Sequence, residues 1–289
     1  MPAVTVEKLL PAARNYGGEM KCTVLIENTA PEHLIAEWGL SVYIEYNGLR
    51  ILLDTGASGN FAENASRLSI DLSRVDFGVL SHAHNDHSDG MDVFFGMNKR
   101  APFYIRKGAR ENCYTQYGED MVYEGIPTGW LDLFSNRIIF AEGNMQVAKG
   151  VWLLPHTTPG LEETGRKAHM YVDVDGEWLA DDLSHEQSLV FETENGLVIF
   201  NSCSHAGADV IVREAQQALP GRDVFAIIGG FHLFETPEGD VRALARRLGD
   251  TGVQRVITGH CTGGHSYAVI ADELGDAVSY LATGSVFVF

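Results

Sequence analysis

Four side chains that commonly bind metal ions stand within six positions of this chain: His82, His84, Asp86 and His87. They follow the apolar residues 77–80, a short run that is typical of a buried strand. A tight loop after a strand directs such side chains into a small volume. Neutral imidazoles and a carboxylate suit Zn²⁺, Mn²⁺ or Fe²⁺, at bond lengths of about 2.0–2.2 Å. The spacing therefore predicts a metal site rather than a histidine-rich polar loop.

Further candidate ligands follow later strand-like runs. Cys203 and His205 come after one such run, His232 follows the next, and His260 follows the last. Each of them lies just past a predicted strand end, and imidazole and thiolate groups are common metal ligands.

The elements that must position these residues begin with hairpin signals. Residues 40–46 and 49–54 are rich in β-branched and apolar side chains, and they flank Asn47 and Gly48. An Asn-Gly pair favours the positive φ that both central positions of a tight hairpin turn require. A second hairpin is predicted within residues 188–200, around another Asn-Gly pair.

The last third of the chain alternates strand and helix patterns. Strand-like runs occur at residues 225–228 and 255–258, with a helical period at 241–248 between them. Hairpins followed by β–α alternation predict an α+β fold in which two sheets are sandwiched between helices, an αββα arrangement.

Domain organisation is predicted from the regularity of these patterns. Residues 1–20 precede the first strand-like run and are expected to form an N-terminal extension. Residues 21–289 are expected to form one domain. Within it, the less regular residues near 91–150 are predicted to be an insertion or cap that faces the substrate.

Composition and charge limit the classes of partner. Acidic residues outnumber basic ones by 39 to 21, giving a formal net charge of −18. Binding to nucleic acids or to anionic membranes relies on Lys and Arg, so this balance argues against both. The four cysteines form no CxxC pair, and residues 1–7 lack the pattern of a secretory signal. We therefore expect a cytoplasmic protein with free thiols and a small-molecule substrate, and a homo-oligomer is compatible with this composition.

Residues 82–87 resemble the HxHxDH motif of the metallo-β-lactamase superfamily. Asp54-Thr55-Gly56 is similar to the strand end found upstream of that motif. Three later segments resemble one branch of the superfamily, the metal-dependent hydrolases often named dihydropterin–ribofuranosylaminobenzene phosphate synthases; these are residues 202–207, 229–233 and 259–263. The resemblance covers most of the chain and implies the metallo-β-lactamase type of αββα fold, although a fold does not fix an activity.

The resemblance also implies a role for individual residues. It assigns His82, His84 and His185 to a first metal ion. It assigns Asp86, His87 and His260 to a second, and it implies that Asp54 orients a metal-bound histidine rather than binding metal itself.

At the bridging position the chain departs from the superfamily, which usually has Gly-Asp there. This sequence has Ser-Cys-Ser-His at residues 202–205, so Cys203 or His205 must complete the site. We favour His205, because its reach past the strand end suits a ligand. Cys203 would select a softer ion if it bound metal, and otherwise it is a small buried residue behind the site.

The function implied by the resemblance is hydrolysis by a water that two divalent ions activate. Zinc is the expected metal, with manganese or iron as alternatives. Asp86 is expected to orient that water and to pass a proton to the leaving group. The branch favours a small, phosphorylated, pterin-like substrate; a lactone or thioester hydrolase and a di-iron redox protein are the alternatives.

Several other residues are expected to contact the substrate. His232 and His156 are candidates for the wall of the substrate pocket. The acidity of the chain means that a phosphate group must be met locally, and the candidate cations for this role are Arg106, Lys107 and Arg110.

Overall fold

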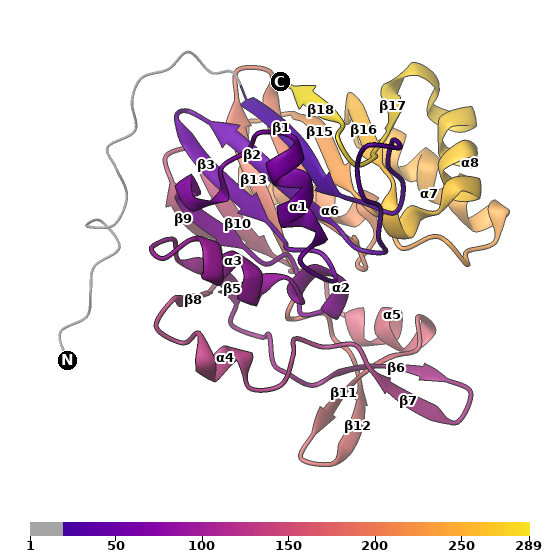
Figure 1. Ribbon diagram of the computed structural model, residues 1–289. Helices are drawn as coiled ribbons and strands as arrows, with labels where there is room; N and C mark the ends of the chain where they lie inside the picture. The colour runs from indigo at the N-terminus through magenta and orange to yellow at the C-terminus, as the bar shows by residue number, and fades with distance from the viewer. Residues whose placement is uncertain (1–19) are drawn as a thin grey trace.

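The computed structural model describes residues 20–289. Two seven-stranded sheets stack face to face, and helices cover the outer face of each (Figure 1). This arrangement confirms the predicted αββα sandwich. The predicted extension, residues 1–20, lies outside the described residues except for Met20, which begins the first strand.

The first sheet has the strand order β18-β1-β2-β3-β4-β5-β8. Its strands are β1 (Met20–Ile26), β2 (Ser41–Tyr46), β3 (Leu49–Leu53), β4 (Phe77–Val79), β5 (Phe103–Arg106), β8 (Ile138–Ala141) and β18 (Val286–Val288). The predicted hairpin is β2–β3, and its turn residues Asn47 and Gly48 have φ values of 49° and 81°. Strands β3, β4, β5 and β8 are parallel, so β4 delivers the histidine motif to the edge where β3 also ends.

The second sheet has the order β17-β16-β15-β14-β13-β10-β9. Its strands are β9 (Met145–Ala148), β10 (Val151–Pro155), β13 (Gln187–Thr193), β14 (Gly196–Phe200), β15 (Val224–Gly229), β16 (Arg255–Thr258) and β17 (Val278–Tyr280). The second predicted hairpin is β13–β14. Strands β14 to β17 are parallel, so the segments that follow β14, β15 and β16 leave the sheet at one edge.

Helices pack on both outer faces through apolar side chains. The first sheet is covered by α1 (Asn60–Arg67) and α3 (Met91–Met97), and the second by α6 (Ala208–Ala218), α7 (Glu238–Gly249) and α8 (Gly264–Leu274). The shorter helices are α2 (Asn85–Ser88), α4 (Trp130–Leu133), α5 (Leu161–Lys167) and the 3₁₀ segments η2 (Leu72–Arg74), η3 (His260–Thr262) and η4 (Gly275–Ala277). No helix of residues 20–289 is long and apolar enough to cross a membrane.

The core between the two sheets consists mainly of apolar side chains. Ile51 and Val79 from the first sheet lie in one buried cluster with Leu153, Leu189 and Ile257 from the second. Burial of such side chains stabilises the fold by about 1.5–3 kcal/mol each. The two strand edges that carry the candidate ligands are thereby held at a fixed spacing.

A four-stranded sheet, which we call the cap sheet, projects from one end of the sandwich (Figure 1). Its order is β12-β11-β6-β7, with β6 (Cys113–Tyr117), β7 (Asp120–Tyr123), β11 (Met170–Val174) and β12 (Glu177–Ala180). The predicted insertion near residues 91–150 coincides with it only in part. That range also holds α3 and strands of both large sheets, and half of the cap sheet comes from a later segment. Pairing of β6 with β11 is a long-range contact that no local pattern reveals.

The inter-sheet core yields a test of the fold. Replacing Leu189, which is fully buried between the sheets, by Ala should lower the free energy of unfolding by about 2–5 kcal/mol, because it leaves a cavity. Leu179→Ala in the cap sheet removes a side chain that is 47% exposed and should change it by less than about 1 kcal/mol. Urea unfolding measures both. Equal losses in the two variants would contradict the described core.

Candidate metal centre

The histidine motif is built on the carboxylate of Asp54, which follows β3 and is fully buried. Its Oδ1 accepts a hydrogen bond from the Ser81 backbone at 2.7 Å, and its Oδ2 accepts from the hydroxyls of Ser81 and Ser202 at 2.7 and 2.6 Å. The same Oδ2 lies 2.9 Å from Nδ1 of His87. Asp54 therefore orients His87 and ties the motif to the end of β14.

Three histidines turn a free nitrogen toward the same region. Nδ1 of His82 bonds to the Ser81 hydroxyl at 2.7 Å, that of His205 bonds to Glu186, and that of His260 lies 3.0 Å from Oδ1 of Asn28. In each ring Nε2 is buried and has no hydrogen-bond partner among the described residues, although Nε2 of His260 lies 3.4 Å from a carboxylate oxygen of Asp86. A buried polar atom without a partner costs about 1–3 kcal/mol. Metal ions bound to these histidines would satisfy the three nitrogens, so the residues present fit such ions.

Cys203 lies between two groups of these ligands. Its Sγ is 3.2 Å from Nε2 of His87. One group combines Cys203 with His82 and His205, and the other combines it with His87 and His260; within each group the ligand atoms lie no more than 4.8 Å apart. The sulfur is thus common to both groups, whereas His205 belongs to the first alone.

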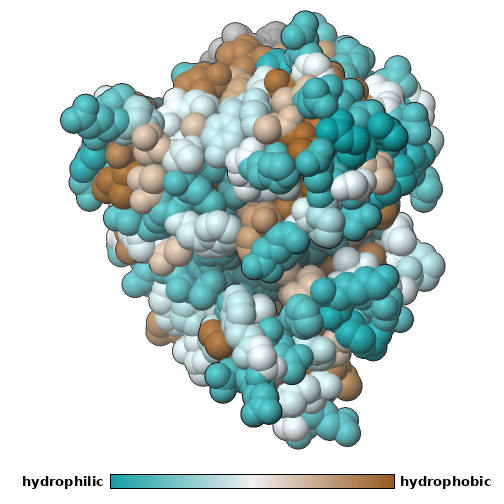
Figure 2. Space-filling view, turned by 90° about the vertical axis from the view of Figure 1, so that its right-hand side faces the viewer, coloured by the Kyte–Doolittle hydropathy of each residue, from teal (hydrophilic) through white to brown (hydrophobic). Residues whose placement is uncertain are grey.

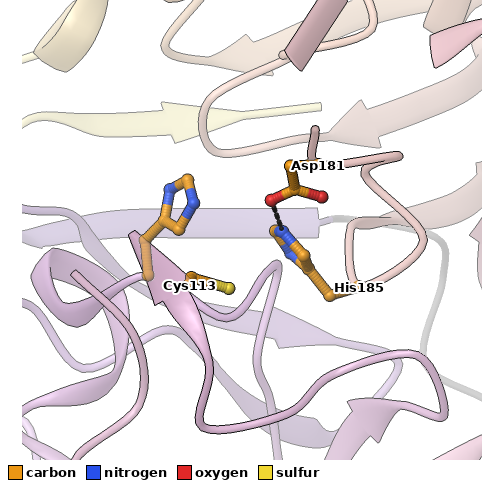
Figure 3. A group of neighbouring side chains, drawn as sticks. Cys113, Asp181 and His185 are labelled. Atoms are coloured by element: carbon orange, nitrogen blue, oxygen red, sulfur yellow. Dashed lines mark hydrogen bonds and ion pairs between the residues drawn. The ribbon is translucent and has the colours of Figure 1, made fainter. Parts of the chain in front are cut away.

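His185 lies beside the cluster, but both of its ring nitrogens have hydrogen-bond partners. Its Nδ1 accepts from the backbone of Ala83 at 3.2 Å, and its Nε2 donates to Oδ2 of Asp181 at 2.8 Å. Figure 3 shows the ring directed at Asp181, with Cys113 nearby. The His185 ring lies 5.3 Å from that of His84 and is therefore close to the candidate site. Neither of its nitrogens is free to bind a metal ion, because both already have hydrogen-bond partners.

Electrostatics favour the metal-binding forms of His82, His84 and Asp86, but the protonated form of His87. Burial, reinforced by the neighbouring histidines, lowers the pKa of His82 and His84, which keeps both rings neutral. Asp86 lies 3.5 Å from His87 and 3.4 Å from His260. Burial alone would raise the pKa of Asp86, but these two histidines hold it below its usual range. For His87, burial is outweighed by Asp86 and Asp54, which raise its pKa to about 9.

His156 is placed differently from the prediction. It does not line the cavity at the motif; it is buried between two carboxylates, 2.8 Å from Glu186 and 2.7 Å from Glu214. Glu214 also accepts bonds from the backbone of Thr157 and Thr158 at 2.7 and 2.8 Å. Since Glu186 holds Nδ1 of His205, this network fixes the orientation of a candidate ligand.

A cavity of about 480 Å³ opens beside the cluster, and Figure 2 shows the surface hollowed where the cap lobe meets the main body. His84, Asp86, Cys203, His205 and His232 are among the residues that line it. His232 lies in the cavity wall, with its ring 4.7 Å from that of His205, and its contact with a substrate stays a prediction.

The cations predicted to meet a phosphate group do not line this cavity. Arg106 donates to the carbonyl of Gly143, and Lys107 pairs with Glu142 at 2.8 Å. Arg110 donates to the carbonyls of Lys107 and Ala109. The sequence pattern of this segment did not indicate that these three side chains are already engaged by carbonyl and carboxylate groups.

Sequence reasoning missed Glu186, Trp38 and Phe234. Glu186 directly follows His185, and only the fold shows that its carboxylate turns toward His205 and His156. Trp38 and Phe234 come from loops with no regular pattern, and both line the cavity. An aromatic residue in a loop is a weak signal by itself, so these contacts required the structure.

The model of the metallo-beta-lactamase superfamily matches residues 39–278. Because this match covers most of the chain and agrees with the αββα sandwich and with the motif at the strand edge, the chain belongs to the metallo-β-lactamase superfamily.

Particular relatives narrow the comparison. The chain is 26% identical, over 88% of its length and 90% of the relative's, to the 7,8-dihydropterin-6-methyl-4-(β-D-ribofuranosyl)-aminobenzene-5′-phosphate synthase of Methanocaldococcus jannaschii. It is similar to the crystal structure of Tm1679, a metal-dependent hydrolase of the β-lactamase superfamily, with 26% identity, a TM-score of 0.79, and coverage of 93% of this chain and 98% of that one. YhfI of Bacillus subtilis shares the fold, with a TM-score of 0.58, 12% identity and coverage of 94% and 100%.

The His156 network makes stability depend on pH. Burial opposes protonation, but Glu186 and Glu214 raise the pKa of His156 to about 9. A raised pKa stabilises the fold below the ordinary value near 6.5, and this contribution disappears as the pH rises through 9. The stability advantage of the native protein over His156→Gln should therefore shrink by about 1–3 kcal/mol between about pH 6 and about pH 9.5.

Urea unfolding of metal-depleted protein at several pH values measures this difference. His265→Gln provides the control, because His265 has 73% of its side chain exposed and should show no such trend. A constant difference between the native protein and His156→Gln would contradict the charged network.

Proposed function

We propose that the chain is a metal-dependent hydrolase whose active centre holds two divalent ions. The observation that carries this proposal is the set of three buried Nε2 atoms, of His82, His205 and His260, that have no hydrogen-bond partner among the described residues. Their other ring nitrogens are each fixed by a polar neighbour, which is the arrangement that orients histidine ligands in metal sites.

In this proposal His82, His84 and His205 hold the first ion, and Asp86, His87 and His260 hold the second. Cys203 would be a ligand shared by both ions, because its sulfur belongs to both groups of ligand atoms. This assignment replaces His185 by His205, whose Nε2 is free. A thiolate among imidazoles favours zinc over manganese.

The chain's own residues then define the reaction. Bound metal ions supply an activated water and polarise the reacting group of the substrate. Asp86, which lines the cavity, orients that water and passes a proton to the leaving group. His232, at the wall next to His205, contacts the substrate.

The substrate is proposed to be a small molecule with one anionic group. The relative from Methanocaldococcus jannaschii is named for a dihydropterin and a ribofuranosyl-aminobenzene phosphate, which favours a phosphorylated, pterin-like compound here. That relative is named a synthase. Its name therefore supports the kind of ring proposed here, but it does not identify the bond that this chain hydrolyses.

Metal content tests the assignment of ligands. Native protein should hold about two equivalents of zinc, and His84→Ala and His205→Ala should each lose about one, because each removes a proposed ligand of the first ion. His185→Ala should retain both equivalents, since that ring bonds to Asp181 instead. The exposed residue His265 provides the control variant His265→Ala. Loss of zinc from His185→Ala, with full retention in His205→Ala, would reverse the assignment.

Activity tests the reaction class. Chelation should abolish hydrolysis of a panel of phosphoesters, lactones and thioesters, and added Zn²⁺ or Mn²⁺ should restore it. Turnover that resists chelation would contradict the hydrolase proposal. Two equivalents of iron, together with O₂ consumption, would favour the di-iron redox alternative.

A further inference from the structure

Two aromatic side chains stand exposed at the wall of the cavity beside the metal centre. Trp38 is 51% exposed and Phe234 is 45% exposed, and their rings meet edge to face with centroids 5.5 Å apart. Trp38 also packs 5.4 Å from the ring of His260, and Phe234 packs 5.3 Å from that of His232. The aromatic wall therefore starts at a candidate metal ligand and leads outward, and a flat ligand that covers it would bury apolar surface.

A second part of the wall comes from the cap sheet and carries an oriented acceptor. The carbonyl of Glu124 accepts from the backbone of Asn85 at 2.8 Å, which joins this segment to the histidine motif. The carboxylate of Glu124 accepts from the hydroxyl of Thr115 at 2.7 Å and from that of Tyr117 at 3.1 Å. Because each carboxylate oxygen accepts about two hydrogen bonds, Glu124 retains capacity for the N–H groups of a ligand.

The part of the cavity wall that lies away from the metal centre carries acidic side chains. Glu235 follows Phe234 and also lines the cavity. Burial and the nearby carboxylates of Glu124 and Glu235 raise the pKa of Tyr117. Among residues 20–289, no lysine or arginine lines this cavity, and Lys167 lines the adjoining one. A second anionic group on a ligand would thus meet carboxylates without a cation to balance it.

We propose that this cavity selects a substrate with one anionic group, bound at the metal centre, and a flat aromatic ring that carries N–H donors. The ring lies against Trp38 and Phe234 and donates hydrogen bonds to Glu124. The position of the anionic group rests on the proposed function, whereas the ring preference rests on the cavity wall. A ring that carries a second carboxylate or phosphate is excluded.

Phosphonates that cannot be hydrolysed test this preference without turnover. Isothermal titration calorimetry on zinc-loaded protein compares benzylphosphonate with its 4-amino and 4-carboxy derivatives and with propylphosphonate. The 4-amino compound should bind about tenfold more tightly than the 4-carboxy compound, because it donates to Glu124 rather than repelling it. Benzylphosphonate should bind about three- to tenfold more tightly than propylphosphonate, because only its ring packs on the aromatic wall.

Two variants assign these preferences to residues. Glu124→Gln should abolish the difference between the 4-amino and 4-carboxy compounds while keeping benzyl over propyl. Trp38→Leu should remove most of the preference for benzyl over propyl while keeping the order of the substituted rings. Trp178→Leu is the matched control, because Trp178 is 46% exposed on the cap sheet and does not line the cavity.

The outcomes separate this inference from the proposed function. Equal affinities for the three benzyl compounds, or a Trp38→Leu variant that behaves like Trp178→Leu, would overturn the ring proposal while the metal centre stands. If the protein holds no zinc and binds no phosphonate, the proposed function fails. The ring is then tested in metal-free protein with aniline and benzoate, detected by NMR, and a lack of preference for aniline would overturn the ring proposal as well.

Discussion

The buried carboxylate of Asp54 connects the parts of this molecule that have to meet. A charge in the interior is stable only when it is fully paired, and here a backbone amide, two hydroxyls and an imidazole surround it. Because Ser81 belongs to the motif loop and Ser202 follows β14, satisfying this one group brings the edges of both large sheets together. The orientation of His87 follows from the same bonds, so the candidate metal centre and the sandwich are fixed by a common constraint.

Local patterns explain what could be predicted from the sequence. The turn at Asn47 and Gly48 needs a positive φ, and the HxHxDH spacing is contained in six residues, so both are visible without tertiary contacts. The proposed replacement of His185 by His205 as a metal ligand is different in kind. Asp181 bonds to one nitrogen of His185, and Glu186 bonds to one nitrogen of His205. The second nitrogen of His185 accepts a hydrogen bond from the backbone of Ala83, whereas that of His205 stays free. The composition of the cap sheet escaped prediction for the same reason, since β6 pairs with β11 across more than fifty residues.

The surroundings of the candidate ligands divide into a rigid and an adaptable part. Behind the cluster, Glu186, His156 and Glu214 form a buried network with opposite charges alternating along it. Such a network is strong only while every member is satisfied, so it tolerates little change. In front of the cluster, Trp38, Tyr117 and Phe234 are exposed and make few polar contacts. Burial thus fixes the side chains behind the proposed metal ions, whereas the side chains that face the solvent in the cavity are free to change.

Two hairpin turns, at Gly118 and at Asp175–Gly176, form the tips of the cap sheet. Both tips point away from the two large sheets (Figure 1). Added Cβ atoms at Gly118 and Gly176 would meet nothing within 4 Å, so only the positive φ of these residues, 64° and 86°, favours glycine at the tips. A longer or shorter hairpin at Gly118, which follows Tyr117 of the cavity wall, would reshape that wall and leave Asp54 and its partners intact. Ligand preference in this architecture can therefore diversify independently of the candidate metal centre, and this hairpin is the natural position for engineering a new specificity.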